Sequence, residues 1–136
     1  MTQDCIFCKI IAGDIPAEKV YENVELLACQ ALNQSSKGHM LIIPKEHSYN
    51  IMSMNPKLGN GLLETIHKVG SAMIKGIPCD GFNTAINFPP VVGEVFHTHI
   101  HLIPRSKGDG LGLWKEFEVN AEERALFAEK IIMALD

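Results

Sequence analysis

The spacing of apolar and polar residues along the chain predicts three helices. Between residues 57 and 75, apolar residues recur at intervals of three and four, which is the period of an amphipathic helix. Gly76 and Pro78 end this helix. Two further helices are predicted, a short one over residues 5–12 and a C-terminal one over residues 121–135. The side chains expected to be buried on the C-terminal helix are Leu126, Phe127, Ile131, Ile132 and Leu135.

Short apolar or β-branched segments bounded by turn residues predict four strands. These strands are expected over residues 20–28, 39–43, 81–87 and 95–103. Ser36, Lys37 and Gly38 form a turn signal before the second strand, and Pro44 and Pro104 end the second and fourth strands. Because short turns join strands to strands, the pattern favours an antiparallel sheet and an α+β fold over a doubly wound α/β fold.

The size and charge of the chain limit the class of protein to which it can belong. It has 136 residues, 46% of them hydrophobic, which fits a single domain over residues 1–136 and excludes wholesale disorder. The longest unbroken apolar run, residues 131–135, is too short to span a bilayer, so no membrane partner is expected. A net charge of −4 without a Lys/Arg run argues against non-specific nucleic-acid binding. The N-terminal residues show no secretory pattern, so we expect a cytoplasmic protein.

The four cysteines are expected to be reduced in such a compartment. Cys5 and Cys8 form a C-x-x-C motif, which suits a metal or a redox pair. Redox motifs of this kind usually follow a strand in a βαβ unit, and here no strand precedes the motif, so a metal is favoured. Cys29 and Cys79 are expected to pack as small apolar side chains.

Three of the six histidines alternate within five residues: His97, His99 and His101. On a strand, this period of two directs all three imidazoles to one face, roughly 6–7 Å apart. A neutral imidazole can act as a nucleophile, a metal ligand or a hydrogen-bond donor. The alternative is a strand that simply exposes polar side chains. His67 lies in the predicted long helix and has no assigned role.

Three segments of the chain, residues 5–17, 38–47 and 95–105, resemble the histidine triad (HIT) superfamily, Hint-type branch, in their order and spacing. The resemblance implies a small α+β domain with an antiparallel sheet, a long helix and a C-terminal helix. It also implies a homodimer in which two sheets join.

For the histidines, the resemblance implies a division of labour. His99 would be the nucleophile that attacks the α-phosphorus of a nucleoside phosphoramidate, dinucleoside polyphosphate or related nucleotide conjugate. A nucleotidyl-histidine would form, and water or another acceptor would release the nucleotide, making the protein a nucleotide hydrolase or nucleotidyl transferase. His101 would donate a hydrogen bond to the phosphate or leaving group, and His39 would support the triad. A purine nucleotide or its conjugate is the implied partner.

The resemblance further implies a structural zinc ion held by Cys5, Cys8, His47 and His97. Two thiolates and two imidazoles make a closed tetrahedral set, which is typical of structural rather than catalytic zinc.

Two segments depart from the family pattern. Ala31 stands where the family carries an acidic residue that holds the ribose, and a methyl group accepts no hydrogen bond. The loop from Asn87 to Glu94 is one residue short and lacks the family glutamine that donates to the α-phosphate. Asn87, Asn83 and Glu94 are the remaining candidates for substrate binding. These departures leave two alternatives open: a weakly active or inactive nucleotide-binding relative, and a zinc-stabilised dimer that acts through protein partners.

Overall fold

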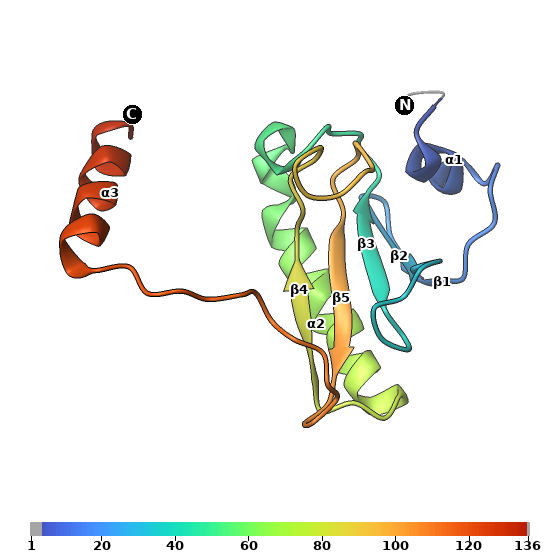
Figure 1. The fold of residues 1–136 in the computed structure, drawn as a ribbon. Helices are drawn as coiled ribbons and strands as arrows, with labels where there is room; N and C mark the ends of the chain where they lie inside the picture. Colours follow the sequence, from blue (N-terminus) through green and yellow to red (C-terminus); the bar gives the residue numbers. More distant parts are fainter. Residues whose placement is uncertain (1–3, 136) are drawn as a thin grey trace.

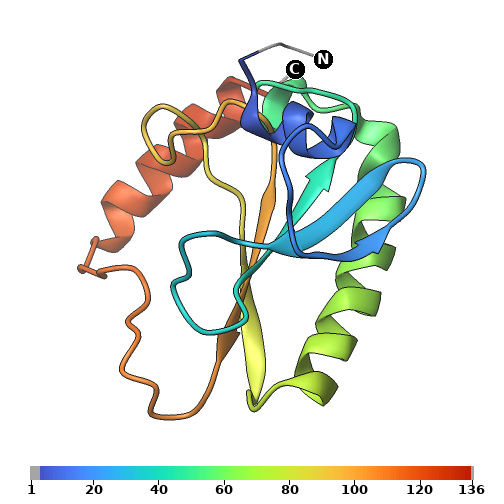
Figure 2. The ribbon, with the colours of Figure 1, turned by 90° about the vertical axis from the view of Figure 1, so that its right-hand side faces the viewer.

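A computed structural model describes residues 4–135 of the chain. Its centre is a five-stranded antiparallel sheet with the strand order β1-β2-β3-β5-β4 (Figure 1). Helix α2 covers one face of the sheet, and α1 lies on the opposite side (Figure 2). The expected antiparallel α+β fold is therefore confirmed. The elements are α1 (Ile6–Ala12), β1 (Lys19–Glu22), β2 (Leu26–Gln30), β3 (Met40–Pro44), η1 (Ile51–Ser53), η2 (Pro56–Leu58), α2 (Gly59–Gly76), β4 (Gly81–Ala85), β5 (Ile100–Arg105) and α3 (Ala121–Met133).

The segment over residues 20–28 starts the sheet, as expected, but it forms a hairpin of two strands, β1 and β2. The carboxamide oxygen of Asn23 accepts hydrogen bonds from the backbone N–H groups of Glu25 (2.9 Å) and Leu26 (2.8 Å). This side chain takes the place of a strand partner and reverses the chain, as Asn commonly does in turns.

The strand predicted over residues 95–103 begins only at Ile100. The residues before it pair with the loop after β3 instead of with a strand: the N–H of Thr98 donates to the Ser48 carbonyl (2.9 Å), and the two side-chain hydroxyls are 2.7 Å apart. Within β5, alternate residues are buried, so His101, Ile103 and Arg105 occupy the less buried positions. The predicted strand over 81–87 ends early, at Ala85.

Two apolar clusters hold the sheet, one on each face. The cluster between the sheet and α2 contains Leu26, Ala28, Met40, Ile42, Leu62, Val69, Met73, Ile100 and Leu102. The cluster on the opposite face packs α1 against the sheet and contains Phe7, Ile10, Leu27, Cys29, Ala31, Leu41 and Ile43. Gly70 lets α2 approach the sheet, because a Cβ there would lie 2.5 Å from the Phe82 ring. The second cluster fixes α1, and with it Cys5 and Cys8, beside the histidines.

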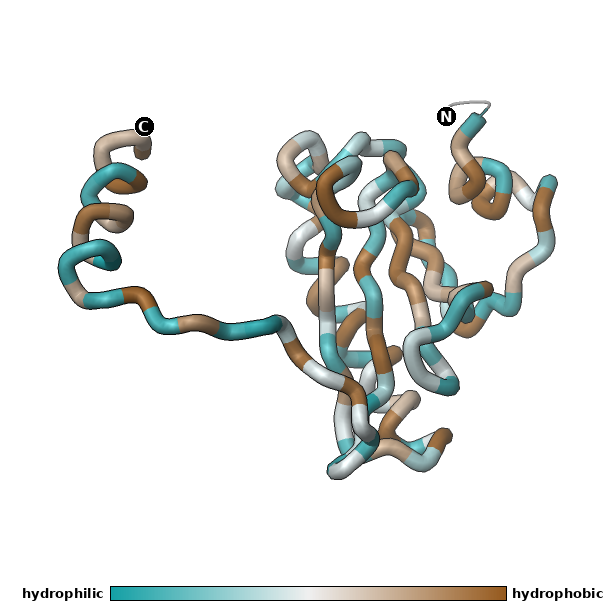
Figure 3. Tube along the Cα trace, viewed as in Figure 1, coloured by the Kyte–Doolittle hydropathy of each residue, from teal (hydrophilic) through white to brown (hydrophobic). Residues whose placement is uncertain are grey.

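The C-terminal segment does not join either cluster. After β5, residues 106–120 run away from the sheet, and α3 stands apart from it (Figure 1). Apolar residues nevertheless recur along α3 (Figure 3). No side chain of α3 is buried by the rest of the described chain, so the expectation of a buried side was wrong for a single copy. None of the helices in residues 4–135 is long and apolar enough to cross a membrane.

Candidate active site and metal centre

His99 is held in one tautomer by the backbone. Its Nδ1 lies 2.7 Å from the carbonyl oxygen of His97, which can only accept, so Nδ1 carries the hydrogen. Nε2 is then left with its lone pair free. Burial lowers the pKa of His99 below its usual value, opposed by the bond to the His97 carbonyl, and so favours the neutral ring. The Phe7 ring packs edge-on against it, with centroids 4.8 Å apart. The ring is thus arranged as a neutral nucleophile.

His39 and His101 form a row that is also oriented from the backbone. The N–H of Ser35 donates to Nδ1 of His39 (3.1 Å), so His39 carries its hydrogen on Nε2. That nitrogen lies 2.9 Å from Nδ1 of His101 and donates to it, which leaves His101 with a hydrogen on Nε2. Nδ2 of Asn87 lies 3.4 Å from this Nε2, and because both atoms carry hydrogen in this arrangement, no hydrogen bond is assigned between them. His101 therefore presents a donor beside His99, whose ring centroid is 4.9 Å away.

The same row of rings is kept neutral by its surroundings. Burial, reinforced by the nearby charges of His99 and His39, lowers the pKa of His101 to about 4. Burial and then His99 lower the pKa of His39 as well. Around neutral pH the site therefore offers one free lone pair and one oriented N–H, without a fixed positive charge on these rings.

The three rings form one wall of a cavity of about 270 Å³ between α1, β2 and β3. Phe7, Ile10 and Leu41 supply apolar surface, and Ala31 lies in the wall between Gln30 and Asn33. Such a mostly apolar cavity with a few polar groups is typical of small-molecule sites. It has the character of a small-molecule site beside the histidines.

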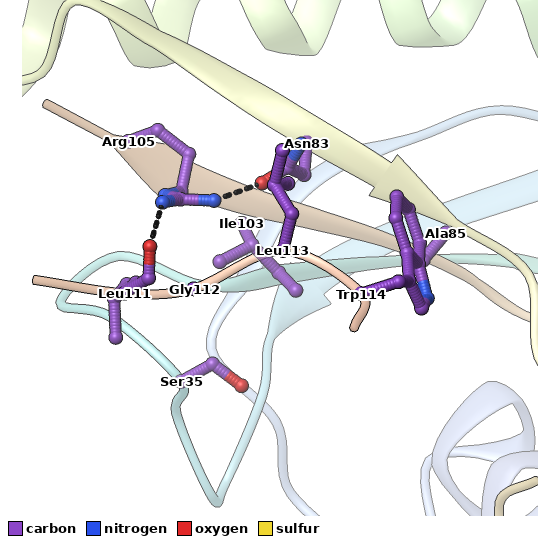
Figure 4. Close-up of a pocket in the computed structure, with 9 residues that line it drawn as sticks. All are labelled: Ser35, Asn83, Ala85, Ile103, Arg105, Leu111, Gly112, Leu113 and Trp114. Atoms are coloured by element: carbon purple, nitrogen blue, oxygen red, sulfur yellow. Dashed lines mark hydrogen bonds between the residues drawn. The ribbon is translucent and has the colours of Figure 1, made fainter. Parts of the chain in front are cut away.

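A second cavity, of about 340 Å³, lies over β4 and β5 (Figure 4). Asn83 lies here, where its carboxamide oxygen accepts a hydrogen bond from Arg105. Trp114 and Leu113, from the segment after β5, complete the wall. A third cavity holds Glu94, beside Cys5 and His47. Of the three predicted substrate-binding residues, the structure thus brings only Asn87 next to a triad ring.

Four predicted metal ligands come together on the other side of His97. One donor atom from each of Cys5, Cys8, His47 and His97 lies within 4.8 Å of all the others. The Nδ1 atoms of the two histidines are 3.0 Å apart, and Nδ1 of His97 is 3.2 Å from Sγ of Cys5 and 3.6 Å from Sγ of Cys8. Neighbouring donors of a tetrahedral zinc ion, at Zn–S of about 2.3 Å and Zn–N of about 2.0 Å, lie roughly 3.3–3.8 Å apart. The observed set fits that geometry.

Protonation also suits a metal at this cluster. Nε2 of His97 donates to the Pro44 carbonyl (2.7 Å), which leaves Nδ1 free to face the thiols. Burial lowers the pKa of His97 and keeps the ring neutral, as a ligand must be. Burial raises the pKa of the Cys5 thiol, so a bound cation is what would keep its thiolate. All four cysteines of the chain are free thiols. The cluster is a possible metal site compatible with zinc.

Sequence reasoning missed the backbone groups that orient these rings. The Ser35 N–H and the Pro44 carbonyl carry no residue-type signal, because any non-proline residue supplies the first and any residue the second. Leu113, which lines the second cavity, also had no assigned place, whereas Trp114 was expected either to approach a partner subunit's site or to act as a packing anchor. The sequence did signal the loop itself, because Ser36 and Gly38 mark the turn that directly follows Ser35.

The family model described as HIT domain matches residues 12–108. Among curated proteins, the chain is 44% identical over 116 residues to "Protein hit" of Bacillus subtilis, covering 83% of this chain and 80% of that protein. It is 38% identical over 112 residues to the Arabidopsis thaliana adenylylsulfatase HINT3, covering 82% and 57% respectively. It is 35% identical over 130 residues to the Schizosaccharomyces pombe adenosine 5'-monophosphoramidase hnt1, covering 93% and 95%.

Solved structures agree with this assignment. The SMU.412c protein of Streptococcus mutans superposes with a TM-score of 0.91 at 38% identity, over 100% of this chain and 88% of that one. A HIT family protein of Bacillus subtilis gives 0.88 at 37% identity, over 98% and 99%. A zinc-bound histidine triad protein of Mycobacterium smegmatis gives 0.76 at 31% identity, over 97% and 98%. The matched family model, the curated relatives and the position of the three alternating histidines lead to one conclusion: this chain belongs to the HIT family and has HINT-type relatives.

Proposed function

We propose that the chain is a nucleotide hydrolase or nucleotidyl transferase that cleaves nucleotide conjugates at the α-phosphate, with His99 as the nucleophile. The observation that carries the proposal is the hydrogen bond from Nδ1 of His99 to the His97 carbonyl, which frees Nε2 beside the cavity. The printed names of two relatives, an adenylylsulfatase and an adenosine 5'-monophosphoramidase, support an adenylyl or similar purine nucleotide as the transferred group.

In the first step, the lone pair of Nε2 of His99 forms a bond to the α-phosphorus. The bond from phosphorus to the leaving group breaks, and the leaving group departs with its electron pair. The His99 ring becomes positively charged, and the His97 carbonyl, which accepts from Nδ1–H, stabilises that charge. Nε2–H of His101 donates a hydrogen bond to the phosphate or to the departing atom.

In the second step, water attacks the phosphorus, the N–P bond breaks, and one proton is released. The nucleoside monophosphate leaves, and His99 returns to its neutral form. Catalysis of phosphoryl transfer depends more on positioned hydrogen-bond donors than on a strong base. The neutral rings of His39 and His101 agree with this requirement. An acceptor other than water in this step would make the reaction a transfer.

The test is release of nucleoside monophosphate from a panel of adenosine phosphoramidate, adenylyl sulfate and diadenosine polyphosphate. The wild-type protein is expected to turn over at least one of them, and His99→Ala is expected to lose that activity. His67→Ala is the matched control, because His67 is exposed on α2, away from the triad. A wild-type protein no faster than His99→Ala on the whole panel would contradict the enzymatic proposal.

Nucleotide binding with little turnover is a second candidate, favoured by Ala31 in the cavity wall and by Glu94 in a different cavity. Loss of a ribose contact weakens binding by roughly 1–3 kcal/mol when a partner is left unpaired. Calorimetry distinguishes the two functions, because this candidate predicts saturable binding of adenosine monophosphate by a protein that turns over none of the panel.

We also propose that the ion at the cluster of Cys5, Cys8, His47 and His97 is zinc, with a structural role, and that the protein is a homodimer. The zinc proposal is supported by the tetrahedral spacing of the donors and by the zinc-bound neighbour from Mycobacterium smegmatis. When bound, the ion would hold α1 to the segment that carries His97. Metal analysis of protein purified under reducing conditions should give close to one zinc per chain, and a clearly lower content would contradict this assignment.

A further inference from the structure

The peptide group between His97 and Thr98 carries the oxygen atom that orients His99. Its carbonyl accepts the hydrogen of Nδ1 of His99 (2.7 Å), and its N–H donates to the carbonyl of Ser48 (2.9 Å). This peptide precedes β5, which begins at Ile100, so it lies outside the strand pairing of the sheet. Because a hydrogen bond weakens when its angle changes, the orientation of His99 depends on what fixes this peptide.

The side chain of His97 holds one end of the peptide. The ring is fully buried, its Nε2 donates to the carbonyl of Pro44 (2.7 Å), and its Nδ1 faces the thiols of Cys5 and Cys8. Both ring nitrogens are therefore engaged, one by the end of β3 and the other by the donor cluster. A ring held at both nitrogens fixes the Cβ attached to it and thereby restricts the backbone of His97.

The loop after β3 joins the donor cluster to the same peptide a second time. His47 supplies a donor to the cluster, and its Nδ1 is 3.0 Å from Nδ1 of His97. The next residue, Ser48, accepts from the N–H of Thr98 and places its hydroxyl 2.7 Å from the Thr98 hydroxyl. A change in the distance between His47 and His97 would therefore also displace the partner of the peptide N–H.

The donor cluster determines how firmly this loop and His97 are held together. Thiolates repel each other, and the lone pairs of neutral imidazoles gain nothing from facing one another, so a cation is what draws the four donors to one centre. With an ion bound, the distance between His47 and His97 is fixed at both ends by metal–nitrogen bonds. The peptide that orients His99 is fixed with it.

We propose that His97 is a positioning residue for the reaction at His99, and that metal loading of the cluster sets what fraction of the protein holds His99 with its hydrogen on Nδ1. The inference rests on the proposed role of His99 as nucleophile. It gives the cluster a task beyond attaching α1. If attachment of α1 were the only task, the effect would reach the cavity through Phe7 of α1, whose ring centroid lies 4.8 Å from that of His99, and would change nucleotide binding.

The test compares three samples of the protein: loaded with zinc, stripped with a chelator under reducing conditions, and stripped and then reloaded with zinc alone. The substrate is the member of the panel that the wild-type protein turns over. Stripping should lower kcat roughly tenfold, which corresponds to the loss of one orienting hydrogen bond, while KM stays within about twofold. Reloading should restore kcat.

Nuclear magnetic resonance on protein with isotope-labelled histidine reads the orientation directly. In a neutral imidazole, the nitrogen that carries hydrogen and the free nitrogen have widely separated shifts, and the spectrum of His99→Ala identifies the His99 signals. Loaded and reloaded protein should carry the hydrogen on Nδ1 of His99, whereas stripped protein should show a mixture of the two tautomers. This measurement needs no turnover, so it still tests the inference if the loaded protein hydrolyses nothing and the proposed function fails.

Two comparisons separate positioning from a general loss of stability. His47→Ala removes a donor and should behave as the stripped protein does, whereas His47→Cys keeps four donors and should recover both kcat and the Nδ1 signal of His99. Leu62→Ala weakens the apolar cluster on the α2 face of the sheet, which contains none of the donors. It should lower the thermal midpoint and leave both readouts unchanged.

Circular dichroism checks that the stripped protein is folded. If it is not, trimethylamine N-oxide is added to all samples, because this osmolyte favours the compact state. Three outcomes would overturn the inference: an unchanged kcat after stripping, a rise in KM alone, or a His99 tautomer that stays the same when the metal is removed.

Discussion

His97 and His99 are two residues apart and have the same imidazole side chain, but their surroundings differ. The His97 side chain is fully buried with Nδ1 among two thiols, whereas His99 lies on the wall of an apolar cavity. In both cases a backbone carbonyl selects the free nitrogen: that of Pro44 holds Nε2 of His97, and that of His97 holds Nδ1 of His99. The backbone partner, not the residue type, decides which ring nitrogen is available. The ring of His97 can therefore serve as a metal ligand, and the ring of His99 as a nucleophile.

The largest expected effect is a loss of catalytic activity that leaves the metal cluster intact. His99→Ala removes the free Nε2 and should lower kcat/KM by roughly 10³-fold or more, because a nucleophile has no substitute in this site. Zinc content should stay as in the wild type, since His99 is not among the clustered donors. Kinetics and metal analysis on one preparation check both statements. A fall in zinc content would show that the two regions are not separable.

The next largest effect concerns the metal cluster that contains His97. Cys8→Ser removes one thiolate donor and should reduce bound zinc and lower the free energy of unfolding by roughly 2–4 kcal/mol. Urea denaturation with and without a chelator measures this. Cys79→Ser is the control, because Cys79 is outside the cluster and should leave the chelator response intact. Equal stability of Cys8→Ser and the wild type in zinc would argue against a structural ion.

A smaller effect is expected at His39, which acts through His101. His39→Ala removes the donor to Nδ1 of His101, so the orientation of Nε2–H is no longer fixed. Loss of one such hydrogen bond corresponds to roughly a tenfold fall in kcat. His39→Gln keeps a donor and should recover part of the rate. A rise in KM alone, with kcat unchanged, would place His39 in nucleotide binding instead of in orientation of the triad.

The smallest effect is a pH dependence. Burial lowers the pKa values of His99 and His101, so both rings stay neutral until the pH is below 6.5. The kcat/KM value should therefore be flat near neutrality and fall on acidification, as His99 becomes protonated. Rate profiles between pH 4 and pH 8 check this, and a midpoint above 6.5 would contradict it.

The same shifts affect folding stability. In the unfolded chain His101 takes up a proton near pH 6.5, whereas in the folded chain it does so only near pH 4. The folded state therefore binds fewer protons in between, and the free energy of unfolding should fall as the pH drops from 6.5 towards 4. Denaturation at fixed steps of pH should show a smaller decline for His101→Asn than for the wild type.

Residue type and spacing predicted the parts of the molecule that depend on them. The three-and-four spacing before Gly76 indicated α2, and C-x-x-C with the family resemblance indicated the four residues that the structure brings together. The hairpin at Asn23 was missed, because Val20, Tyr21 and Val24 on both sides of the turn are residues that favour strands. Ser35 and Pro44 were missed because they act through backbone groups. The apolar residues of the C-terminal helix predicted a buried side, but no side chain of α3 is buried within residues 4–135, because periodicity does not say what a helix packs against.

The position of β5 has a consequence for synthesis of the protein. This strand is the last of the sheet along the chain, yet it lies between β3 and β4, and Met40 pairs with Leu102 across 62 residues of sequence. A nascent chain must therefore wait for residues 100–105 to leave the ribosome before the sheet can close. His99 and His101 emerge with this strand, so a truncated product that ends before β5 has neither a closed sheet nor a triad. Catalytic activity of this protein would therefore require that synthesis has passed the last strand of the sheet.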